Sequence, residues 1–497
     1  MVRFTFLVAV TLLVGQPGLA QTVLTGPSTS AQYREQGAAE LARLRAARPI
    51  EGRARNVIIF IGDGMGVSTL TAARIHQGQI AGVDGVSFVP AMDRLRHTAL
   101  VKTYSHDSQV ADSAPTATAI LAGIKTWNGA IGIGPEARPG DCASGRGREL
   151  PSLVALAQAS GRATGVVSTT RITHATPAAT YAHTVDRDWE ADADLPAEAR
   201  AAGCKDIARQ MMENPEGARL DVILGGGRRM LLPTTTADPE YADRRGSRTD
   251  RRNLIEEWRR RTRGRFVWNA EQFAALNPKR DRRVLGLFEP DHMRYEADRR
   301  GDKAGEPSLA EMTRAAINIL RSDPDGFVLM VEGGRIDHAH HDGNARRALE
   351  DTIALDDAVR TVLEMVDLEN TLVVVTSDHS HAFTISGYPA RENPILGVAA
   401  SPVGQPSKAQ DGKPYTTLGY ANGPGAVTVL PRPDPAAGDT TALDFRQQSL
   451  VPLGSETHGG EDVVVRASGP MAHLFGGTIE QHTIFHVVNE ALGGSAK

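Results

Sequence analysis

The amino-acid sequence predicts a three-layer α/β fold, in which a central, mostly parallel sheet lies between helices. Short apolar runs of strand character recur along the chain, and segments with helical spacing separate them. Several runs end directly in Gly, Asp, Glu or Ser. Strands that alternate with helices favour parallel pairing, with helices covering both faces of the sheet. The expected strands are 57–61, 163–168, 221–224, 327–331 and 372–376, and the helical patterns between them include 152–159, 309–320 and 344–366.

Length and composition restrict the class of protein. At about 100 to 200 residues per domain, 497 residues allow two to four domains, or one large α/β domain with insertions. A hydrophobic fraction of 41% with 23% charged residues is typical of a globular protein and excludes a disordered or fibrous chain. The net charge of -4 argues against a dedicated nucleic-acid-binding protein, which would need a basic surface.

The first residues indicate export. Arg3 precedes an apolar run, 4–14, that is too short to span a bilayer, and small residues follow it, so residues 1–20 are expected to be a signal peptide. No later run reaches the roughly 18 to 20 apolar residues of a membrane span, and 491–497 has no apolar anchor tail. We therefore expect a soluble periplasmic or secreted protein. In such a compartment Cys142 and Cys204 form either one disulfide or two separate structural thiols.

The remaining elements are assigned from local pattern. Residues 31–47 have helical spacing and are expected to form a helix that stands off the core. The Arg-rich stretch 244–265 is interpreted as a solvated helical face. From 387 to 455 the chain is rich in Gly and Pro, with short extended pieces such as 426–430, which indicates an inserted subdomain. Sheet-like sequence resumes at 463–465.

The first expected strand delivers a carboxylate to the sheet edge. The run 57–61 is followed by Asp63, which stands directly before Gly64-Met65-Gly66. In parallel sheets, ligands bind beyond the carboxyl ends of the strands. A dinucleotide-binding fingerprint would need a further glycine where Val67 stands, so a nicotinamide cofactor is disfavoured.

Two further strands deliver acids and imidazoles. The run 327–331 is followed by Glu332 and then by Asp337 and His341, which lie one turn apart if this segment is helical. The run 372–376 leads to the cluster Asp378, His379 and His381, and Glu456-Thr457-His458 is a further candidate. One such cluster alone is more often a hydrogen-bonded structural pair. Three clusters at converging strand ends would repel one another without bound cations. Mixed Asp and His ligands suit zinc and an all-oxygen set suits magnesium, so two or more metals are expected.

The candidate nucleophile is Ser113. Pro115 fits the first turn of a helix, which places Ser113 at a helix N-terminus where an oxyanion and a phosphate are stabilised. The alternative is a plain Ser N-cap. The flanking residues lack the glycines of a hydrolase nucleophile elbow, so activation would have to come from a metal.

These motifs, taken in order, resemble those of alkaline phosphatase. The resemblance runs from about residue 56 to the C-terminus, and it is carried by 63–66, 112–118, 174–177, 181–184, 331–338, 378–381 and 457–460. Three segments away from these motifs resemble the animal-type branch in particular: 104–106, 286–290 and 422–425.

The resemblance implies two zinc ions and one magnesium ion per subunit. One zinc would take Asp337, His341 and His458, the other Asp63, Asp378 and His379, and the magnesium Asp63, Thr176 and Glu332. Arg187 matches the arginine whose planar fork holds two phosphate oxygens. His381 would orient Asp337, and His174 and His338 would lie near the magnesium.

The resemblance also implies further structural features. The family's calcium site matches Glu240, the Phe288 carbonyl, Glu289 and Glu306, with Glu306 replacing the usual Asp. Cys142 and Cys204 match a family disulfide. The implied domains are a helical arm at 21–50, an α/β core at 51–386 and 456–497, and a crown-like insert at 387–455; the arm and the insert imply a homodimer.

The implied activity is metal-dependent hydrolysis of small-molecule phosphate monoesters. It would proceed through a phosphoserine on Ser113, with broad substrate range and an alkaline optimum. A sulfatase would need Arg where Ala117 stands. A phosphodiesterase with the same metals is a closer rival. A metal-storage protein would give no reason for Ser113 and Arg187 to accompany the ligand clusters.

Overall fold

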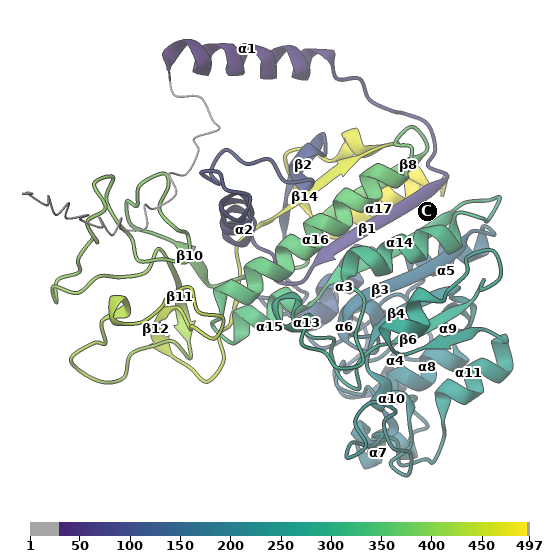
Figure 1. The fold of residues 1–497 in the computed structure, drawn as a ribbon. Helices are drawn as coiled ribbons and strands as arrows, with labels where there is room; N and C mark the ends of the chain where they lie inside the picture. The colour runs from purple at the N-terminus through teal and green to yellow at the C-terminus, as the bar shows by residue number, and fades with distance from the viewer. Residues whose placement is uncertain (1–28, 495–497) are drawn as a thin grey trace, which may run out of the picture.

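The structure, a computed structural model, describes residues 29–494. Its centre is a ten-stranded sheet in the order β15-β2-β14-β8-β1-β7-β3-β4-β6-β5, with helices along both faces (Figure 1). The strands from β8 to β5 pair in parallel, whereas β14 is antiparallel to both neighbours. The predicted fold class is confirmed. The expected signal peptide, 1–20, lies outside the described residues.

The five predicted strands form the middle of this sheet. Each predicted run overlaps one of the strands β1 (Asn56–Gly62), β3 (Ala163–Arg171), β4 (Val222–Gly226), β7 (Phe327–Gly333) and β8 (Thr371–Ser377). Successive residues of β1 pack in opposite layers, with Ile59 in one apolar cluster and Phe60 in the other. Because helices cover both faces, both sets of side chains are apolar and the strand is a continuous hydrophobic run.

Two layers of helices cover the sheet. The layer that packs on Phe60 contains α2 (Val67–Ile80), α14 (Leu309–Leu320) and α16 (Ala345–Met365), and the opposite layer contains α3 (Ser113–Ala122), α5 (Leu153–Ala159), α8 (Ile207–Glu213) and α17 (Thr483–Ala491). A capping box starts α14, since the Ser308 hydroxyl accepts from the Glu311 N–H and the Glu311 carboxylate accepts from the Ser308 N–H. The shorter helices are α4 (Cys142–Gly145), α6 (Ala175–Ala178), α7 (Ala197–Ala201), α9 (Pro215–Arg219), α10 (Arg228–Leu231), α12 (Ala270–Ala274), α13 (Glu296–Arg299) and α15 (Arg335–His341).

Five further strands complete the sheet on either side of the central ones. They are β2 (His97–Lys102), β5 (Arg265–Val267), β6 (Val284–Leu287), β14 (Val463–Ser468) and β15 (Thr478–Glu480). In β2 only alternate residues, Ala99 and Val101, are buried, because its other face is exposed. The two-residue strands β9 (Ser380–His381) and β13 (His458–Gly459) pair with each other beside the main sheet.

A second, three-stranded sheet is formed by one strand just before the expected insert 387–455 and two strands within it. Its strands are β10 (Phe383–Ile385), β11 (Leu418–Gly423) and β12 (Gln448–Pro452). The extended piece expected at 426–430 is not part of this sheet. Only Ala426 makes a β-bridge there, to Ser449, and the Leu430 side chain is 93% exposed.

The expected helical face at 244–265 is only partly correct. Its second half is α11 (Leu254–Thr262), but the first half is not helical. The Arg248 side chain is fully buried and forms ion pairs of 2.8 Å with Asp206 and 2.5 Å with Asp250. The buried Arg248 and its two carboxylate partners hold this loop in place. A stretch rich in charged residues was therefore not exposed to solvent along its whole length.

The N-terminal helix stands away from the body of the molecule, as expected. Figure 1 shows α1 (Ser30–Ala46) extended beyond the sheet and its helices. A capping box formed by Thr29 and Gln32 starts it, and none of its residues is buried. Among residues 29–494 no helix combines the length and apolar character that crossing a bilayer requires.

Candidate metal centre and active site

Three central strands bring three carboxylates to one place. β1 lies between β7 and β8, and in register Ile61 pairs with Glu332 and Gly62 with Ser377. Asp63 follows β1, Glu332 stands near the end of β7, and Asp378 follows β8. All three side chains are fully buried. Parallel pairing therefore places the three carboxylates side by side at the carboxyl edge of the sheet.

The Ser113 hydroxyl faces one group of candidate ligands. Its oxygen lies 3.3 Å from Asp63 Oδ1 and 3.2 Å from His379 Nε2. His379 Nε2 is also 3.3 Å from Asp378 Oδ2. Ser113 is the first residue of α3, but the N-cap is Asp112, whose Oδ1 accepts from the Ala114 N–H at 2.7 Å. The alternative that Ser113 is a plain N-cap is wrong, and its hydroxyl is directed to the carboxylates.

A second group surrounds Asp337. α15 places Asp337 and His341 four residues apart on one face. Asp337 Oδ1 lies 3.4 Å from His341 Nε2, 3.3 Å from His458 Nε2 and 2.9 Å from His381 Nε2. The two nitrogens His341 Nε2 and His458 Nε2 are themselves 3.2 Å apart. Together these four side chains offer ligand atoms within 4.8 Å of one another, which suits one metal ion.

A third group contains Asp63, His174 and Glu332, with Thr176 beside them. Glu332 Oε2 accepts from the hydroxyls of Ser168 and Thr170, and Thr176 also interacts with this carboxylate. Within residues 29–494, however, Asp63 Oδ2 and Glu332 Oε1 are buried without a hydrogen-bond partner. Buried carboxylate oxygens left in this state are costly, and a cation would satisfy both.

The electrostatics of these groups also favour bound cations. Burial, followed by the charges of Asp378 and Asp337, raises the pKa of Asp63 well above its usual range. Burial raises the pKa of Glu332 to about 7, although the hydrogen bonds from Ser168 and Thr170 oppose that rise. Donor types, unpartnered oxygens and crowded negative charge therefore all fit metal ions at this edge of the sheet.

Arg187 and three histidines border the same site. The Arg187 guanidinium donates to Asp112 Oδ1 at 3.1 Å and lies 2.9 Å from His174 Nε2. The His174 and His338 rings are 5.5 Å apart, and His292 stands 4.2 Å from His338. The sequence analysis did not include His292, because it belongs to no strand-end cluster.

Glu456 belongs to the candidate segment before His458, but no role was predicted for it from the sequence. Its Oε2 lies 2.6 Å from His381 Nδ1, and its Oε1 accepts from the Ala382 N–H at 2.7 Å. His381 in turn faces Asp337 through its other nitrogen. The buried chain Glu456–His381–Asp337 fixes the orientation of the Asp337 carboxylate. Its only signal in the sequence is that it stands two residues before His458.

A separate acidic cluster lies near the end of β6. Glu240, Glu289 and Asp302 offer ligand oxygens within 4.8 Å of one another, and Asp302 was not predicted. Glu240 Oε1, Asp302 Oδ2 and Glu306 Oε2 are buried without hydrogen-bond partners among the described residues. Burial, followed by the charge of Glu289, raises the pKa of Glu306 to about 9. Phe288 is fully buried next to Glu289.

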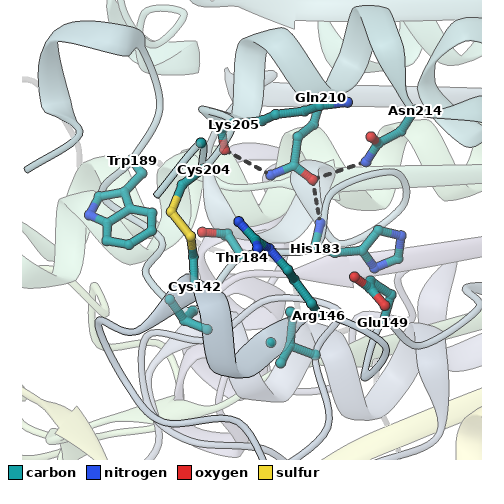
Figure 2. A pocket seen from close by; sticks show the side chains of 14 residues that line it. Cys142, Arg146, Glu149, His183, Thr184, Trp189, Cys204, Lys205, Gln210 and Asn214 are labelled. Atoms are coloured by element: carbon teal, nitrogen blue, oxygen red, sulfur yellow. Dashed lines mark hydrogen bonds between the residues drawn. A yellow bond between two sulfur atoms is a disulfide. The ribbon is translucent and has the colours of Figure 1, made fainter. Parts of the chain in front are cut away.

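The predicted disulfide Cys142–Cys204 is confirmed, and it packs against residues on either side of Arg187. Figure 2 shows it at the wall of a pocket of about 250 Å³, beside Thr184 and Trp189. Val185 and Trp189 are buried in an apolar cluster against which both cysteines pack. In addition, the Trp189 carbonyl accepts from the Ile207 N–H at 2.8 Å. The segment is thus anchored on both sides of Arg187.

Comparison with known proteins gives a consistent result. The family model for alkaline phosphatase matches residues 54–493. Alkaline phosphatase from Gadus morhua is 46% identical over 450 residues, which cover 88% of this chain and 91% of that protein. The tissue-nonspecific alkaline phosphatase isozyme of Homo sapiens is 45% identical over 443 residues, or 88% and 83% of the two chains.

Solved structures agree with these relatives. The alkaline phosphatase of Thermus thermophilus is 27% identical with a TM-score of 0.64, covering 91% of this chain and 94% of that one. A TAB5 alkaline phosphatase variant with Mg bound in its M3 site is 26% identical with a TM-score of 0.61, covering 90% and 99%. The resemblance predicted from the motifs is confirmed: the chain belongs to the alkaline phosphatase family and hydrolyses phosphate monoesters.

Proposed function

We propose that this enzyme cleaves small phosphate monoesters through a phosphoserine on Ser113, within a centre of two zinc ions and one magnesium ion. The observation that carries the proposal is the position of the Ser113 hydroxyl, 3.3 Å from Asp63 and 3.2 Å from His379, with Arg187 held on the neighbouring Asp112. We expect a broad range of small monoesters, because the proposed contacts grip the phosphate rather than the leaving group, and an alkaline optimum.

The proposed ligand sets follow the three groups of side chains. One zinc is assigned to Asp337, His341 and His458. The other is assigned to Asp63, Asp378 and His379, where Asp378 Oδ2 lies 3.3 Å from His379 Nε2. The magnesium is assigned to Asp63, Thr176 and Glu332. When bound, such cations neutralise phosphate charge and lower the pKa of a hydroxyl that they contact. The two zinc sets combine carboxylate oxygens with imidazole nitrogens, and the magnesium set has oxygen donors only, as each metal prefers.

Each residue of the site has a separate role in the proposed reaction. Arg187 holds two non-bridging phosphate oxygens with its planar fork and orients phosphorus toward Ser113. Ser113 Oγ releases its proton to solvent and attacks phosphorus in line. The bond between phosphorus and the leaving oxygen breaks on the opposite side, and that oxygen takes up a proton from solvent to leave as the alcohol. Water then attacks the phosphoserine, which releases orthophosphate and returns a proton to Ser113. Asp112 holds Arg187 in place, and Glu456 and His381 fix Asp337.

The test is chemical trapping of the intermediate. Rapid acid quenching during turnover of an aryl phosphate, followed by peptide mapping by mass spectrometry, is expected to find phosphate on Ser113. Phosphate found on a histidine or on another hydroxyl would contradict the assignment. A methyl diester of the same aryl phosphate is expected to turn over much more slowly, which separates this function from that of a phosphodiesterase.

A calcium ion is proposed at the acidic cluster near β6. The expected ligands are Glu240, the Phe288 carbonyl, Glu289 and Glu306, and the unpartnered oxygen of Asp302 supports its addition to the set. Replacing Asp302 with Asn is expected to lower calcium content and the Tm, measured by elemental analysis and calorimetry. Asp298→Asn is the control, because Asp298 pairs with Arg347 outside this cluster. Equal calcium content in both variants would remove Asp302 from the site.

Breaking the disulfide is expected to raise KM for a monoester by about three- to tenfold, with little change in kcat or metal content. The bond closes a loop between residues 62 positions apart, so its loss also lowers the free energy of unfolding, by about 4 kcal/mol on the loop-entropy scale. The measurement compares the oxidised enzyme with the Cys142→Ser, Cys204→Ser variant at a temperature where both are folded.

An Arg187→Ala background controls this prediction. If the disulfide acts by holding Arg187, breaking it in that background leaves KM unchanged. The same rise in KM with and without Arg187 would show that the bond stabilises the fold and does not position the arginine.

An exported homodimer is also proposed. α1 extends from the body with Tyr33, Leu41 and Leu44 about half exposed, and a second subunit would cover these side chains. Light scattering of the mature protein is expected to give about twice the mass of one chain, and a mass equal to one chain would reject the dimer.

A further inference from the structure

A groove lined by arginines lies beside α11, far along the sheet from the central strands. The hollow measures about 390 Å³ and is formed by the end of α11, the start of β5 and the turn before β6. We call it the arginine groove, and its arginines are Arg259, Arg263, Arg265, Arg280, Arg282 and Arg283.

The arginine groove and the active site open at opposite edges of the sheet. Arg265 is the first residue of β5, and Arg283 directly precedes β6. Both strands run parallel to β4, β3 and β7, so the groove lies at their amino ends. Asp63 and Glu332 lie at the carboxyl ends of β1 and β7. A molecule in the groove therefore cannot reach Ser113, and the groove is a binding site and not a catalytic one.

The local charge is strongly positive in a chain whose net charge is -4. Asp281 is the one acid that lines the groove with the six arginines. Burial raises its pKa, but the Asn277 N–H and the charges of Arg280 and Arg265 outweigh burial and hold the pKa of Asp281 below its usual value. Arg259 pairs with Glu256, and Arg283 lies 3.7 Å from Asp221. Arg263 and Arg265 form no ion pair with any residue between 29 and 494, so positive charge is left in excess.

The backbone under these two arginines is tightly fixed. Arg263 ends α11 in the left-handed region, at φ 56°, and its N–H donates to the Arg259 carbonyl at 2.9 Å. A Cβ on the next residue, Gly264, would stand 2.2 Å from the buried Trp258 ring. The Arg265 N–H donates to the Arg283 carbonyl at 2.8 Å, which joins the two walls. A backbone in the left-handed region costs free energy for an arginine, and here the surrounding packing holds the Arg263 backbone in that conformation.

We propose that the arginine groove binds an oligophosphate, a chain or ring of at least three phosphate groups. Arginine stays charged at every working pH and donates two parallel hydrogen bonds to one phosphate. A single phosphate would occupy two or three of the guanidinium groups and leave the rest repelling one another. An oligophosphate carries charge along the whole hollow, whose volume lies within the range of small-molecule sites. The charge excess and the fixed walls thus match a multiply charged phosphate ligand.

Cyclic trimetaphosphate is the appropriate probe, because it has three phosphates and no terminal phosphoryl group for the enzyme to hydrolyse. Its binding to the metal-loaded enzyme is measured by titration calorimetry, beside orthophosphate. The test variant is Arg263→Ala, Arg265→Ala. The control is Arg300→Ala, Arg446→Ala, which removes the same charge from two exposed arginines that do not line the groove. Both variants are expected to keep the wild-type turnover of an aryl phosphate.

The expected result is one trimetaphosphate site per chain that weakens at least about tenfold in the test variant and is unchanged in the control. Its affinity is expected to fall steeply as salt is raised. Equal weakening in both variants would show general charge attraction and overturn the proposal. So would absence of a site in the wild type, or orthophosphate binding the groove as tightly as trimetaphosphate.

Discussion

Replacing Ser113 with alanine is expected to lower kcat for an aryl phosphate by at least about a thousandfold. The change removes the only oxygen that the proposed reaction phosphorylates, so no phosphoserine forms and the two-step route is closed. The metals are expected to remain, because Ser113 lies at the edge of the ligand groups and supplies none of the assigned donors. Turnover of an aryl phosphate and elemental analysis of the same preparation check both statements.

Ser152→Ala is the matched control for this variant. Ser152 is also a buried serine at the start of a helix, where its hydroxyl accepts from the Ala155 N–H and donates to the Thr180 carbonyl. Its loss is expected to cost about 1 kcal/mol of stability and to leave kcat near that of the wild type. Full activity in Ser113→Ala would reject the nucleophile. Loss of metal from that variant would mean that the serine supports the site instead.

The central sheet could be predicted from the sequence because its strands are buried on both faces. Strand β1 offers five apolar residues in succession, a pattern that solvent-exposed strands do not show. At the edges this signal disappears, since β2 buries only alternate residues and β5 is three residues long. Apolar residues do not mark a buried strand everywhere, since Val429 and Leu430 face solvent.

The acids of the site were predicted from their positions at strand ends, and their roles from the resemblance. Asp63, Glu332 and Asp378 follow directly from strand ends that pair in register. The role of Glu456 could not be predicted this way, because it acts on His381, 75 positions earlier, through packing of the insert boundary against β9. Asp302 and His292 likewise depend on how a loop folds back onto the body, and a local pattern does not carry that information.

Removing the metals from the native enzyme is expected to abolish turnover and to lower the Tm by several degrees. Ions held at about a thousand times their dissociation constants contribute about 4 kcal/mol, which chelation removes. Chelation also leaves Asp63, Glu332 and Asp378 buried together, with Asp63 Oδ2 unpartnered among residues 29–494. Zinc and magnesium added back are expected to restore both activity and Tm.

The effect of the Asp63→Asn change on the Tm is expected to have opposite signs with and without metal. The folded pKa of Asp63 is raised by burial and by neighbouring acids, so its ionised form costs the folded state stability as pH rises above the value in the unfolded chain. At pH 9 and without metal, Asn at position 63 is therefore expected to raise the Tm above that of the metal-free native enzyme. With zinc and magnesium present the same change is expected to lower the Tm, because the proposed bridging ligand is lost. A variant that is less stable in both states would show that Asp63 is held by the protein alone, and the metal centre would then need other ligands.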